Sequence, residues 1–388
     1  MKRKVVYFTS SRAEYGVMRS VLKAIDHDPK LSLSLMVTGA HLNPKYGRTI
    51  DDIRKDGFHI SAKFKMDTGR GNGFAMARSF GDCVARVADV LRRVKPDLLI
   101  LQADRAETLA AAIAASYLNV PIVHMSGGDV TSGGSIDDAI RHATSKFAHI
   151  HLASTRASAR RLTRLMEEPW RVHYVGNPGV DLRREKYTSA SAIAERLSLD
   201  LNKPVLVVIY HPVKAELDMT ERNTEEVMEA IKRLKMQTVV LYPNQDPGSD
   251  IVIRVIRKYS KLDFVRVIKS LRRDDFIGLL RVANAIVGNS SSALIEAPSI
   301  KLPAVNVGPR QQDRERSNNV IDVGYDRNKI AAAIRKAVSD ADFRRRIGRT
   351  PYAKVHTDKR IVSILRNLRL DRRLLLKKCY EGEVANFR

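Results

Sequence analysis

The sequence predicts an α/β protein with two doubly wound, Rossmann-like domains whose strand ends face one cleft. Strand-length apolar runs alternate with helix-length amphipathic segments through most of the 388 residues. The alternation pauses at the Gly/Pro-rich stretch Tyr174–Asp181 and then restarts, which indicates a junction. With 44% hydrophobic residues, a chain of this length has enough apolar surface for two cores.

The first half alternates strands and helices. The expected strands are Val5–Phe8, Leu31–Val37, Asp97–Leu101, Pro121–His124 and His149–Ala153. The expected helices are Ala13–Ile25, Thr49–Lys55, Arg78–Val94, Thr108–Leu118 and Ile136–Lys146. Because helical segments separate the strands, we expect a parallel sheet covered by helices on both faces.

The second half repeats this order. The expected strands are Pro204–Tyr210, Thr238–Tyr242, Phe264–Val267, Ala285–Val287 and Ala304–Val307. The expected helices are Thr224–Leu234, Ile251–Lys258, Phe276–Ala283, Ala293–Ala297 and Ile330–Ala337. We therefore predict domains at residues 1–175 and 176–358.

Residues 359–388 form a basic tail with a net charge of +6, partly on the run LRNLRLDRRLLLKK. This run is expected to be helical. It either packs across the domains, crossing back to the first, or binds an anionic partner through its basic side.

Composition excludes several protein classes. The two cysteines, Cys83 and Cys379, cannot form a disulfide framework, and no CxxC pair suggests zinc. The sequence shows neither a signal peptide nor an 18-residue apolar stretch, so we expect a cytoplasmic protein without a membrane span. No cofactor and no metal are expected. The net charge of +25 suits nucleic acid, an anionic surface or a phosphorylated substrate, or is solvated surface charge.

Polar clusters follow several expected strands of the second half. The stretch Gly288–Ser292 leads from a strand into a helix, where backbone N–H groups bind anions, unless the serines simply cap the helix. Glu296 could accept hydrogen bonds from a ribose, and Arg310 could hold a phosphate. His211 could serve as an acid, a base or a phosphate ligand, or be structural. The stretch Tyr242–Ser249 is either a further cluster or an ordinary turn.

The first half offers carboxylates at corresponding places. Asp104 follows a strand and is either a proton carrier or a helix cap. A Gly-rich turn ending at Asp129 precedes Asp137, near a helix start, and Arg141 one turn later. Paired acids in a cleft suit proton abstraction and return, although capping and ion pairing would explain them equally. No GxxxxGK[ST] or GxGxxG motif is present, which argues against kinase-type or dinucleotide chemistry.

A series of motifs occurs in order over residues 7–325: TSSRAEYG, VTGAHLNPKYG, QADRAETLA, SGGD, SIDDAIRHATSKFAHIHLAST, GNPGVD, HPV, PNQDPGS and GNSSSALIEAP. In these motifs the chain resembles the hydrolysing UDP-N-acetylglucosamine 2-epimerases. That family makes free N-acetylmannosamine for sialic-acid-type sugars, or the diacetylbacillosamine equivalent. The resemblance implies a GT-B-like fold, a UDP-sugar substrate and a homodimer or homotetramer. No nucleic-acid partner is expected, because no RNA- or DNA-binding motif is visible and aromatic residues make up only 6%.

The resemblance also implies site roles. Ser290, Ser291 and Arg310 would hold the diphosphate, and Glu296 the ribose. Arg12 and Arg105 would help to bind the phosphate and the sugar, and Arg141 is a further expected substrate-binding residue. The residues expected to be catalytic are Asp104, Asp129, Asp137 and His211. In the implied mechanism a base removes the C2 proton while UDP leaves, and water adds to the resulting glycal as a proton returns to the other face of C2.

One position departs from the family pattern. Well-known members carry Glu-Gly-Gly-Glu after the matching strand, with a catalytic first glutamate, whereas this chain has Ser126 there and Asp129 at the second acid. A serine without a base of its own cannot abstract the C2 proton. Either Asp129 or Asp104 has taken over, or the substrate or stereochemical course differs, or epimerisation is lost while binding persists. A GT-B glycosyltransferase and a non-catalytic nucleotide-sugar binder are the first two rival hypotheses. The third is a nucleic-acid-binding role, which would rest on charge alone.

Overall fold

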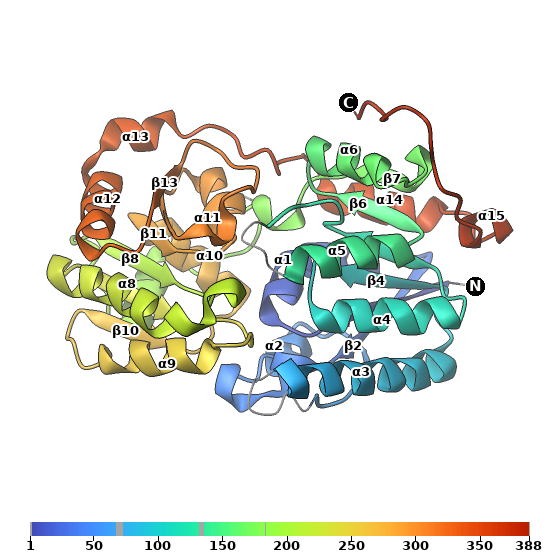
Figure 1. Ribbon diagram of the computed structural model, residues 1–388, viewed down its shortest axis with the longest axis horizontal. Coiled ribbons are helices and arrows are strands. Elements are labelled where there is room, and N and C mark those ends of the chain that lie inside the picture. The colour runs from blue at the N-terminus through green and yellow to red at the C-terminus, as the bar shows by residue number, and fades with distance from the viewer. Residues whose placement is uncertain (1, 67–72, 132–135, 183, 388) are drawn as a thin grey trace.

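The computed structural model describes residues 2–66, 73–131, 136–182 and 184–387. Two parallel sheets lie side by side along the long axis of the molecule (Figure 1). Within the described residues the first sheet has seven strands in the order β3-β2-β1-β4-β5-β6-β7, and the second has six in the order β10-β9-β8-β11-β12-β13. We call each sheet with its helices the first and the second lobe. The predicted fold class is confirmed.

The first lobe runs from β1 to β7. Its strands are β1 (Arg3–Thr9), β2 (Leu31–Val37), β3 (Ile60–Lys63), β4 (Leu98–Gln102), β5 (Ile122–Met125), β6 (Ile150–Ala153) and β7 (Val172–Tyr174). Its helices are α1 (Arg12–Asp26), α2 (Ile50–Lys55), α3 (Gly73–Val94), α4 (Ala106–Tyr117), α5 (Ile136–Phe147) and α6 (Arg156–Arg164).

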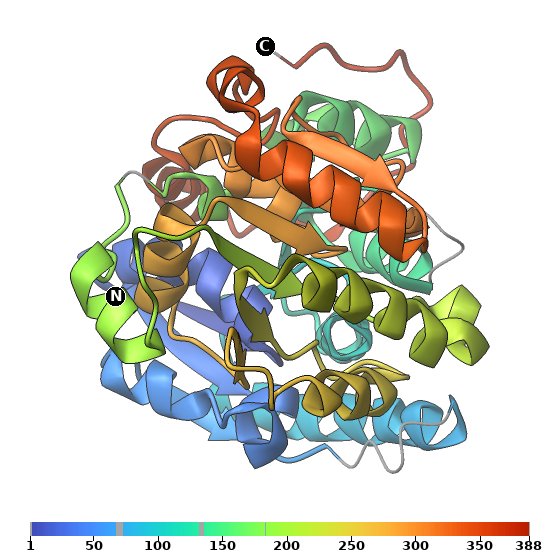
Figure 2. The same cartoon turned by 90° about the vertical axis from the view of Figure 1, so that its left-hand side faces the viewer.

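The second lobe, seen from its own side in Figure 2, follows the same plan. Its strands are β8 (Val205–Ile209), β9 (Gln237–Leu241), β10 (Val265–Ile268), β11 (Ala285–Gly288), β12 (Ala304–Val307) and β13 (Val320–Val323). Its helices are α7 (Ala190–Leu197), α8 (Thr220–Leu234), α9 (Ser249–Lys258), α10 (Arg273–Val282), α11 (Ser292–Ile295), α12 (Arg327–Ser339) and α13 (Ala341–Arg346).

The central strands are mostly apolar because helices cover both faces of each sheet. In β4, Leu98 and Ile100 belong to one hydrophobic cluster, while Leu99 and Leu101 belong to another on the opposite face. The edge strands β3, β7 and β13 were not expected from the sequence. Each is short and carries polar residues, so none has the apolar run of a central strand.

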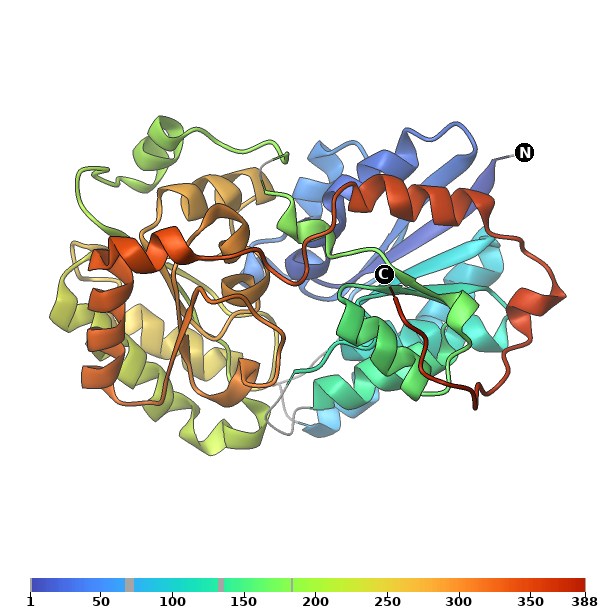
Figure 3. The same cartoon turned by 90° about the horizontal axis from the view of Figure 1, so that it is seen from above.

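The tail returns to the first lobe. Helix α14 (Thr357–Asn367) packs along α1, and Ile361, Leu365 and Leu374 belong to the core cluster beneath it (Figure 3). The expected basic helix is not continuous, because α14 ends at Asn367 and α15 (Arg372–Leu375) is a single turn. None of the helices in the described ranges has both the length and the hydropathy needed to span a bilayer.

The guanidinium of Arg171 holds the α15 turn of this tail in place. It is fully buried and donates hydrogen bonds to the carbonyl oxygens of Leu374, Arg373 and Leu376, at 2.8, 3.0 and 3.1 Å. A fourth bond, of 3.2 Å, goes to the carbonyl of His149. The carbonyls of Arg373, Leu374 and Leu376 lie at the end of α15, where helix carbonyls lack partners within the helix, so the Arg171 side chain supplies their hydrogen bonds.

Candidate active site

The loops after the strands of both sheets meet in a cleft between the lobes. The cleft has two cavities, and residues such as Val17, Ser291 and Arg310 line both, so the cavities are continuous. We call the cavity toward the second lobe the anion end and the cavity toward the first lobe the carboxylate end. Strand ends of parallel sheets are where α/β folds bind their ligands.

The anion end contains the turn after β11. Gly288 has a φ of +124°, and a side chain there would lie 2.1 Å from the carbonyl oxygen of Ile209 on β8, so the close approach of the two strands requires glycine. Ser290 and Ser291 then enter the cavity ahead of α11. The Arg310 guanidinium donates to the carbonyl of Asn289 at 2.9 Å, which holds it beside this turn.

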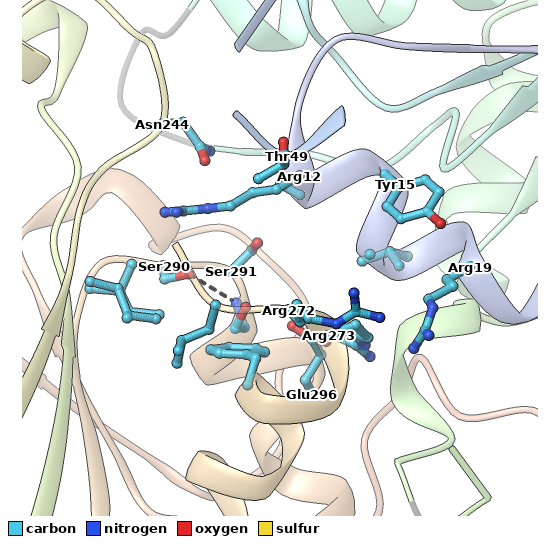
Figure 4. A pocket seen from close by; sticks show the side chains of 18 of the residues that line it. Arg12, Tyr15, Arg19, Thr49, Asn244, Arg272, Arg273, Ser290, Ser291 and Glu296 are labelled. Carbon is cyan, nitrogen blue, oxygen red and sulfur yellow. Dashed lines mark hydrogen bonds and ion pairs between the residues drawn. The ribbon is translucent and has the colours of Figure 1, made fainter. Parts of the chain in front are cut away.

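Arg12 reaches the same cavity from the other lobe. It extends from the start of α1 across the cavity (Figure 4) and donates 2.5 Å hydrogen bonds to the carbonyls of Lys269 and Tyr242. Burial lowers the pKa of Arg12 to about 10, so the side chain stays cationic at neutral pH. With Arg310 and the serine hydroxyls it forms a set of donors suited to a diphosphate.

Glu296 lies at the floor of the anion end, paired with Arg273 (Figure 4). Arg273 also forms an ion pair with Glu185 at 2.8 Å and donates to the carbonyl of Gly179 at 3.0 Å. Burial opposes its charge, but the two glutamates outweigh burial and raise the pKa of Arg273. The pair holds the Glu296 carboxylate in place as an acceptor. Arg273 lies in no recognisable sequence motif, so it was not predicted as a site residue.

His211 lies between the cavity and the backbone of its own lobe. Its backbone exchanges hydrogen bonds with the Asn289 side chain, and its Nδ1 accepts the backbone N–H of Asn244 at 3.3 Å. Because Nδ1 accepts, the neutral ring carries its proton on Nε2. Burial, with Arg310 second, lowers the pKa of His211 to about 3, so the ring is a neutral hydrogen-bond donor at working pH.

Arg141 organises the carboxylate end. The buried guanidinium pairs with Asp104 and Asp138 and donates to the backbone carbonyl of Asp129 at 3.0 Å and to Thr131 Oγ1 at 2.8 Å. Burial lowers the pKa of Arg141, but the carboxylates outweigh burial and raise it. Arg141 therefore brings Asp104 and Asp129 together.

Asp129 and Asp137 complete this end. Asp129 is 4% exposed, accepts a 3.3 Å hydrogen bond from the Tyr352 hydroxyl and lies 3.6 Å from the guanidinium of Arg314. Asp137 Oδ1 lies 2.5 Å from Nζ of Lys214, which belongs to the second lobe. Burial raises the pKa of Asp137, but Lys214 outweighs burial and holds the pKa below its usual value.

A second ion pair links the lobes beside this one. Arg105 forms ion pairs with Glu107 and Asp246 at 3.3 and 3.2 Å and donates to the carbonyl of Gln245 at 3.1 Å. Asp246 follows β9 on the second lobe. Burial opposes its charge, but Arg105 outweighs burial and lowers the pKa of Asp246.

Ser126 lies at the bottom of the carboxylate end in a left-handed backbone conformation, with a φ of +64°. Its hydroxyl lies 3.0 Å from Oγ of Ser154 and accepts a 3.4 Å hydrogen bond from Nε2 of Gln102. No carboxylate contacts the hydroxyl among the described residues, so Ser126 is a neutral member of the cavity wall.

All eleven site residues predicted from the sequence line the cleft. Those at the anion end are Arg12, His211, Ser290 and Glu296, those at the carboxylate end are Asp104, Arg105, Asp129, Asp137 and Arg141, and those at both are Ser291 and Arg310. Lys214, Asp246 and Glu14 also line the cleft, but they were not among the site residues predicted from the sequence. The stretch Tyr242–Ser249 could have revealed Asp246, since it follows a strand.

Comparisons with known proteins show which family and fold the chain shares. A family model described as UDP-N-acetylglucosamine 2-epimerase matches residues 23–366. The chain is 37% identical, over 97% of its length and 99% of the relative's, to the UDP-N,N'-diacetylbacillosamine 2-epimerase (hydrolyzing) of Legionella pneumophila. It is 32% identical to the polysialic acid biosynthesis protein P7 of Escherichia coli, over 86% and 85% of the two chains. The crystal structure of the UDP-GlcNAc 2-epimerase of Neisseria meningitidis, bound to UDP-GlcNAc, superposes with a TM-score of 0.74 at 18% identity, over 94% and 99% of the two chains.

Proposed function

The chain belongs to the UDP-N-acetylglucosamine 2-epimerase family of enzymes, and from that premise we propose that it is a hydrolysing UDP-HexNAc 2-epimerase. In this proposal it eliminates UDP from the sugar, adds water to the glycal, and releases a free N-acetylmannosamine-type sugar. One observation carries the proposal: a cationic, hydroxyl-lined cavity opens directly into a cavity lined by Asp104, Asp129 and Asp137.

The anion end would bind the nucleotide. Arg12, Arg310 and the hydroxyls of Ser290 and Ser291 offer donors to the diphosphate, and Glu296 accepts from the ribose. As the C1–O bond breaks, negative charge grows on the leaving UDP. Fixed cations and the Nε2–H group of neutral His211 stabilise that charge without reorganising.

The carboxylate end would handle the protons. One carboxylate takes the C2 proton while the C1–O bond breaks, which leaves a double bond between C1 and C2. Water then gives its hydroxyl to C1, and a proton returns to the opposite face of C2. Asp104, Asp129 and Asp137 are the proposed acid and base groups, because Ser126 has no base among its contacts.

Incubation of the pure protein with UDP-GlcNAc and with UDP-N,N'-diacetylbacillosamine in D₂O tests this function. The expected result is UDP together with a free 2-epimerised sugar that carries deuterium at C2. Intact nucleotide sugars would contradict the proposal. If calorimetry then shows binding, the rival hypothesis of a non-catalytic nucleotide-sugar binder is supported. Transfer of the sugar to an acceptor without deuterium at C2 would indicate a glycosyltransferase.

From the family alone we infer that the protein assembles as a homodimer or homotetramer. Light scattering coupled to size-exclusion chromatography would measure its mass in solution. An anionic partner for the basic tail is a separate proposal. Its test is retention of the protein on an anionic matrix, with and without substitution of the exposed Arg369 and Arg372 by glutamine.

A further inference from the structure

Helix α5 carries Asp137 and Arg141 to the carboxylate end, but within the described chain none of its residues belongs to a hydrophobic core cluster. Its buried residues are Ile140, Arg141, Thr144 and Ser145, of which only Ile140 is apolar. Most helices in proteins are held in place by an apolar face that packs on the core. The position of α5 therefore depends largely on hydrogen bonds and ion pairs.

The C-terminal tail holds the last turn of α5. Nζ of Lys377 donates hydrogen bonds to the carbonyl oxygens of Ser145 and Lys146 at 3.3 and 2.9 Å. Carbonyls at the C-terminal end of a helix lack partners within the helix, and the helix dipole favours a cation there. The ammonium of Lys377 therefore caps α5, although it lies 232 residues beyond Ser145 in the sequence.

Glu167 holds the ammonium of Lys377 against the helix. Its carboxylate is 0% exposed and lies 2.7 Å from Nζ of Lys377, 3.0 Å from Nζ of Lys146 and 2.9 Å from Nε2 of His151. A buried carboxylate is costly unless it is paired, so this contact strongly favours one position of the ammonium. The neighbouring Lys378, in contrast, has an exposed side chain.

His124 connects the same turn of α5 to the loop that carries Asp104. The ring is fully buried, with Nδ1 3.0 Å from the hydroxyl of Ser145 and Nε2 2.8 Å from the carbonyl oxygen of Ala103. Burial lowers the pKa of His124 to about 3, so the ring is neutral. Nε2 then donates to the carbonyl, and Nδ1 accepts from Ser145. Ala103 has a left-handed φ of +61°, a conformation that persists only where surrounding contacts hold it.

We propose that Lys377 is a positioning residue of the carboxylate end, which holds α5 and thereby the side chains of Asp137 and Arg141. The link through His124 extends this support to Asp104. Small displacements of reacting groups lower the rate of a reaction, so the tail contributes to catalysis without touching substrate. The anion end takes its donors from α1 and the second lobe, so nucleotide binding should not depend on Lys377. The effect on rate rests on the proposed function.

The test compares Lys377→Met with Lys378→Met, which removes a neighbouring lysine of the same tail. Well below the melting temperature, Lys377→Met should lower kcat for UDP release about five- to tenfold with the UDP-sugar that is turned over faster. KM, and the Kd for UDP from calorimetry, should stay within about twofold of wild type. Lys377→Arg keeps a cation with several donors and should retain at least about half of the wild-type kcat. Lys378→Met should leave all of these values unaltered.

A double variant separates positioning from a loss of stability. Lys377→Met leaves the buried Glu167 without one of its cations, which should lower the melting temperature. Lys377→Met combined with Glu167→Gln removes that buried charge, so the melting temperature should recover whereas kcat should stay low. Recovery of kcat in the double variant would overturn the proposal. An unaltered kcat in Lys377→Met would also overturn it, as would a loss of UDP affinity as large as the loss of kcat.

Hydrogen exchange followed by mass spectrometry reports on α5 without any turnover. The amides of α5 should exchange faster in Lys377→Met than in the wild type and in Lys378→Met, while those of the second lobe exchange at the wild-type rate. If the wild type releases UDP from neither sugar, the proposed function fails, and exchange still decides whether Lys377 positions α5. Faster exchange in α5 would support this role, and unaltered exchange would overturn it.

Discussion

Lys214 and Asp137 join the two lobes across the mouth of the carboxylate end. The ammonium of Lys214, in the segment after β8, lies 2.5 Å from a carboxylate oxygen of Asp137 at the start of α5. Both side chains are about one-fifth exposed, so water weakens the attraction only in part. The ion pair thus couples the charge on a proposed catalytic carboxylate to the position of the opposite lobe.

Replacement of Lys214 should change the pH dependence of the reaction. Lys214→Gln removes the cation that holds the pKa of Asp137 down against burial, so this pKa should rise. The acid limb of the kcat/KM profile should then move to higher pH. At pH 6 we expect kcat/KM to fall about tenfold. The profile is measured by UDP release from pH 5 to 9. Lys214→Arg keeps the charge and should retain the wild-type limb. An unshifted limb in Lys214→Gln would show that Asp137 does not govern it.

The Ser126→Glu variant tests whether another residue serves as the base at C2 in place of the glutamate that relatives carry at position 126. Ser126 is 6% exposed and contacts Gln102 and Ser154, so a longer, charged side chain must displace them. We expect kcat for UDP release to fall about tenfold and the melting temperature to fall with it. Ser126→Ala, which only removes the hydroxyl, should cost less in both measurements. Faster turnover in Ser126→Glu would mean that the chain lacks a C2 base that glutamate can supply.

Glu14 should make the stability of the fold depend on pH. Burial raises the pKa of this carboxyl to about 7, against the opposing effect of Arg105. As the pH rises above about 4.5, the unfolded chain releases this proton first, so the free energy of unfolding falls until the pH reaches about 7. The contribution is ~3 kcal/mol.

Urea denaturation of Glu14→Gln at pH 5 and pH 8 measures this contribution, because glutamine does not ionise. The fall in the free energy of unfolding between the two pH values should be ~3 kcal/mol smaller in the variant than in the wild type. An equal fall in both proteins would indicate that Glu14 is already ionised at pH 5, held by its hydrogen bonds from the backbone N–H groups of Ser10 and Ser11.

Loss of Arg171 should release the tail. Arg171→Ala removes four hydrogen bonds to backbone carbonyls, three of them at the end of α15, and we expect the free energy of unfolding to fall by about 3 kcal/mol. Limited digestion with trypsin should cleave within residues 368–378 faster than in the wild type. Arg369→Ala, at an exposed position of the same segment, is the control and should leave both measurements near wild type. Unchanged digestion of Arg171→Ala would show that other contacts hold the tail.

The central strands could be predicted because they contain runs of mostly apolar, buried residues. Strands β2 and β12 begin and end at the predicted residues, Leu31–Val37 and Ala304–Val307. The edge strand β3 has the sequence ISAK and no fully buried residue, so its sequence carries no comparable signal. Helix α6, over Arg156–Arg164, has four arginines outside its buried side and was missed for the same reason. The division of the chain at residues 175 and 358 stays a prediction.

The candidate site could be found because its residues follow apolar strands or belong to family motifs. Asp104 and His211 are of this kind. Pairings across the cleft, such as Arg105 with Asp246, could not be predicted, because they depend on how the two lobes are oriented. Burial is equally invisible in one sequence: Arg141 lines the cavity, but its side chain is only 1% exposed and is paired with Asp104 and Asp138. Its role in binding substrate stays a prediction.

The return of α14 to the first lobe has a consequence for the order in which the protein can fold during synthesis. The core beneath α1 includes Ile361, Val362 and Leu365, which leave the ribosome only after the whole second lobe has been made. Until then the growing chain carries an incomplete first lobe with an uncovered apolar groove along α1. The first lobe, although it is translated first, can therefore complete its core only after the second lobe has been made. A stop codon before residue 361 would damage the first lobe.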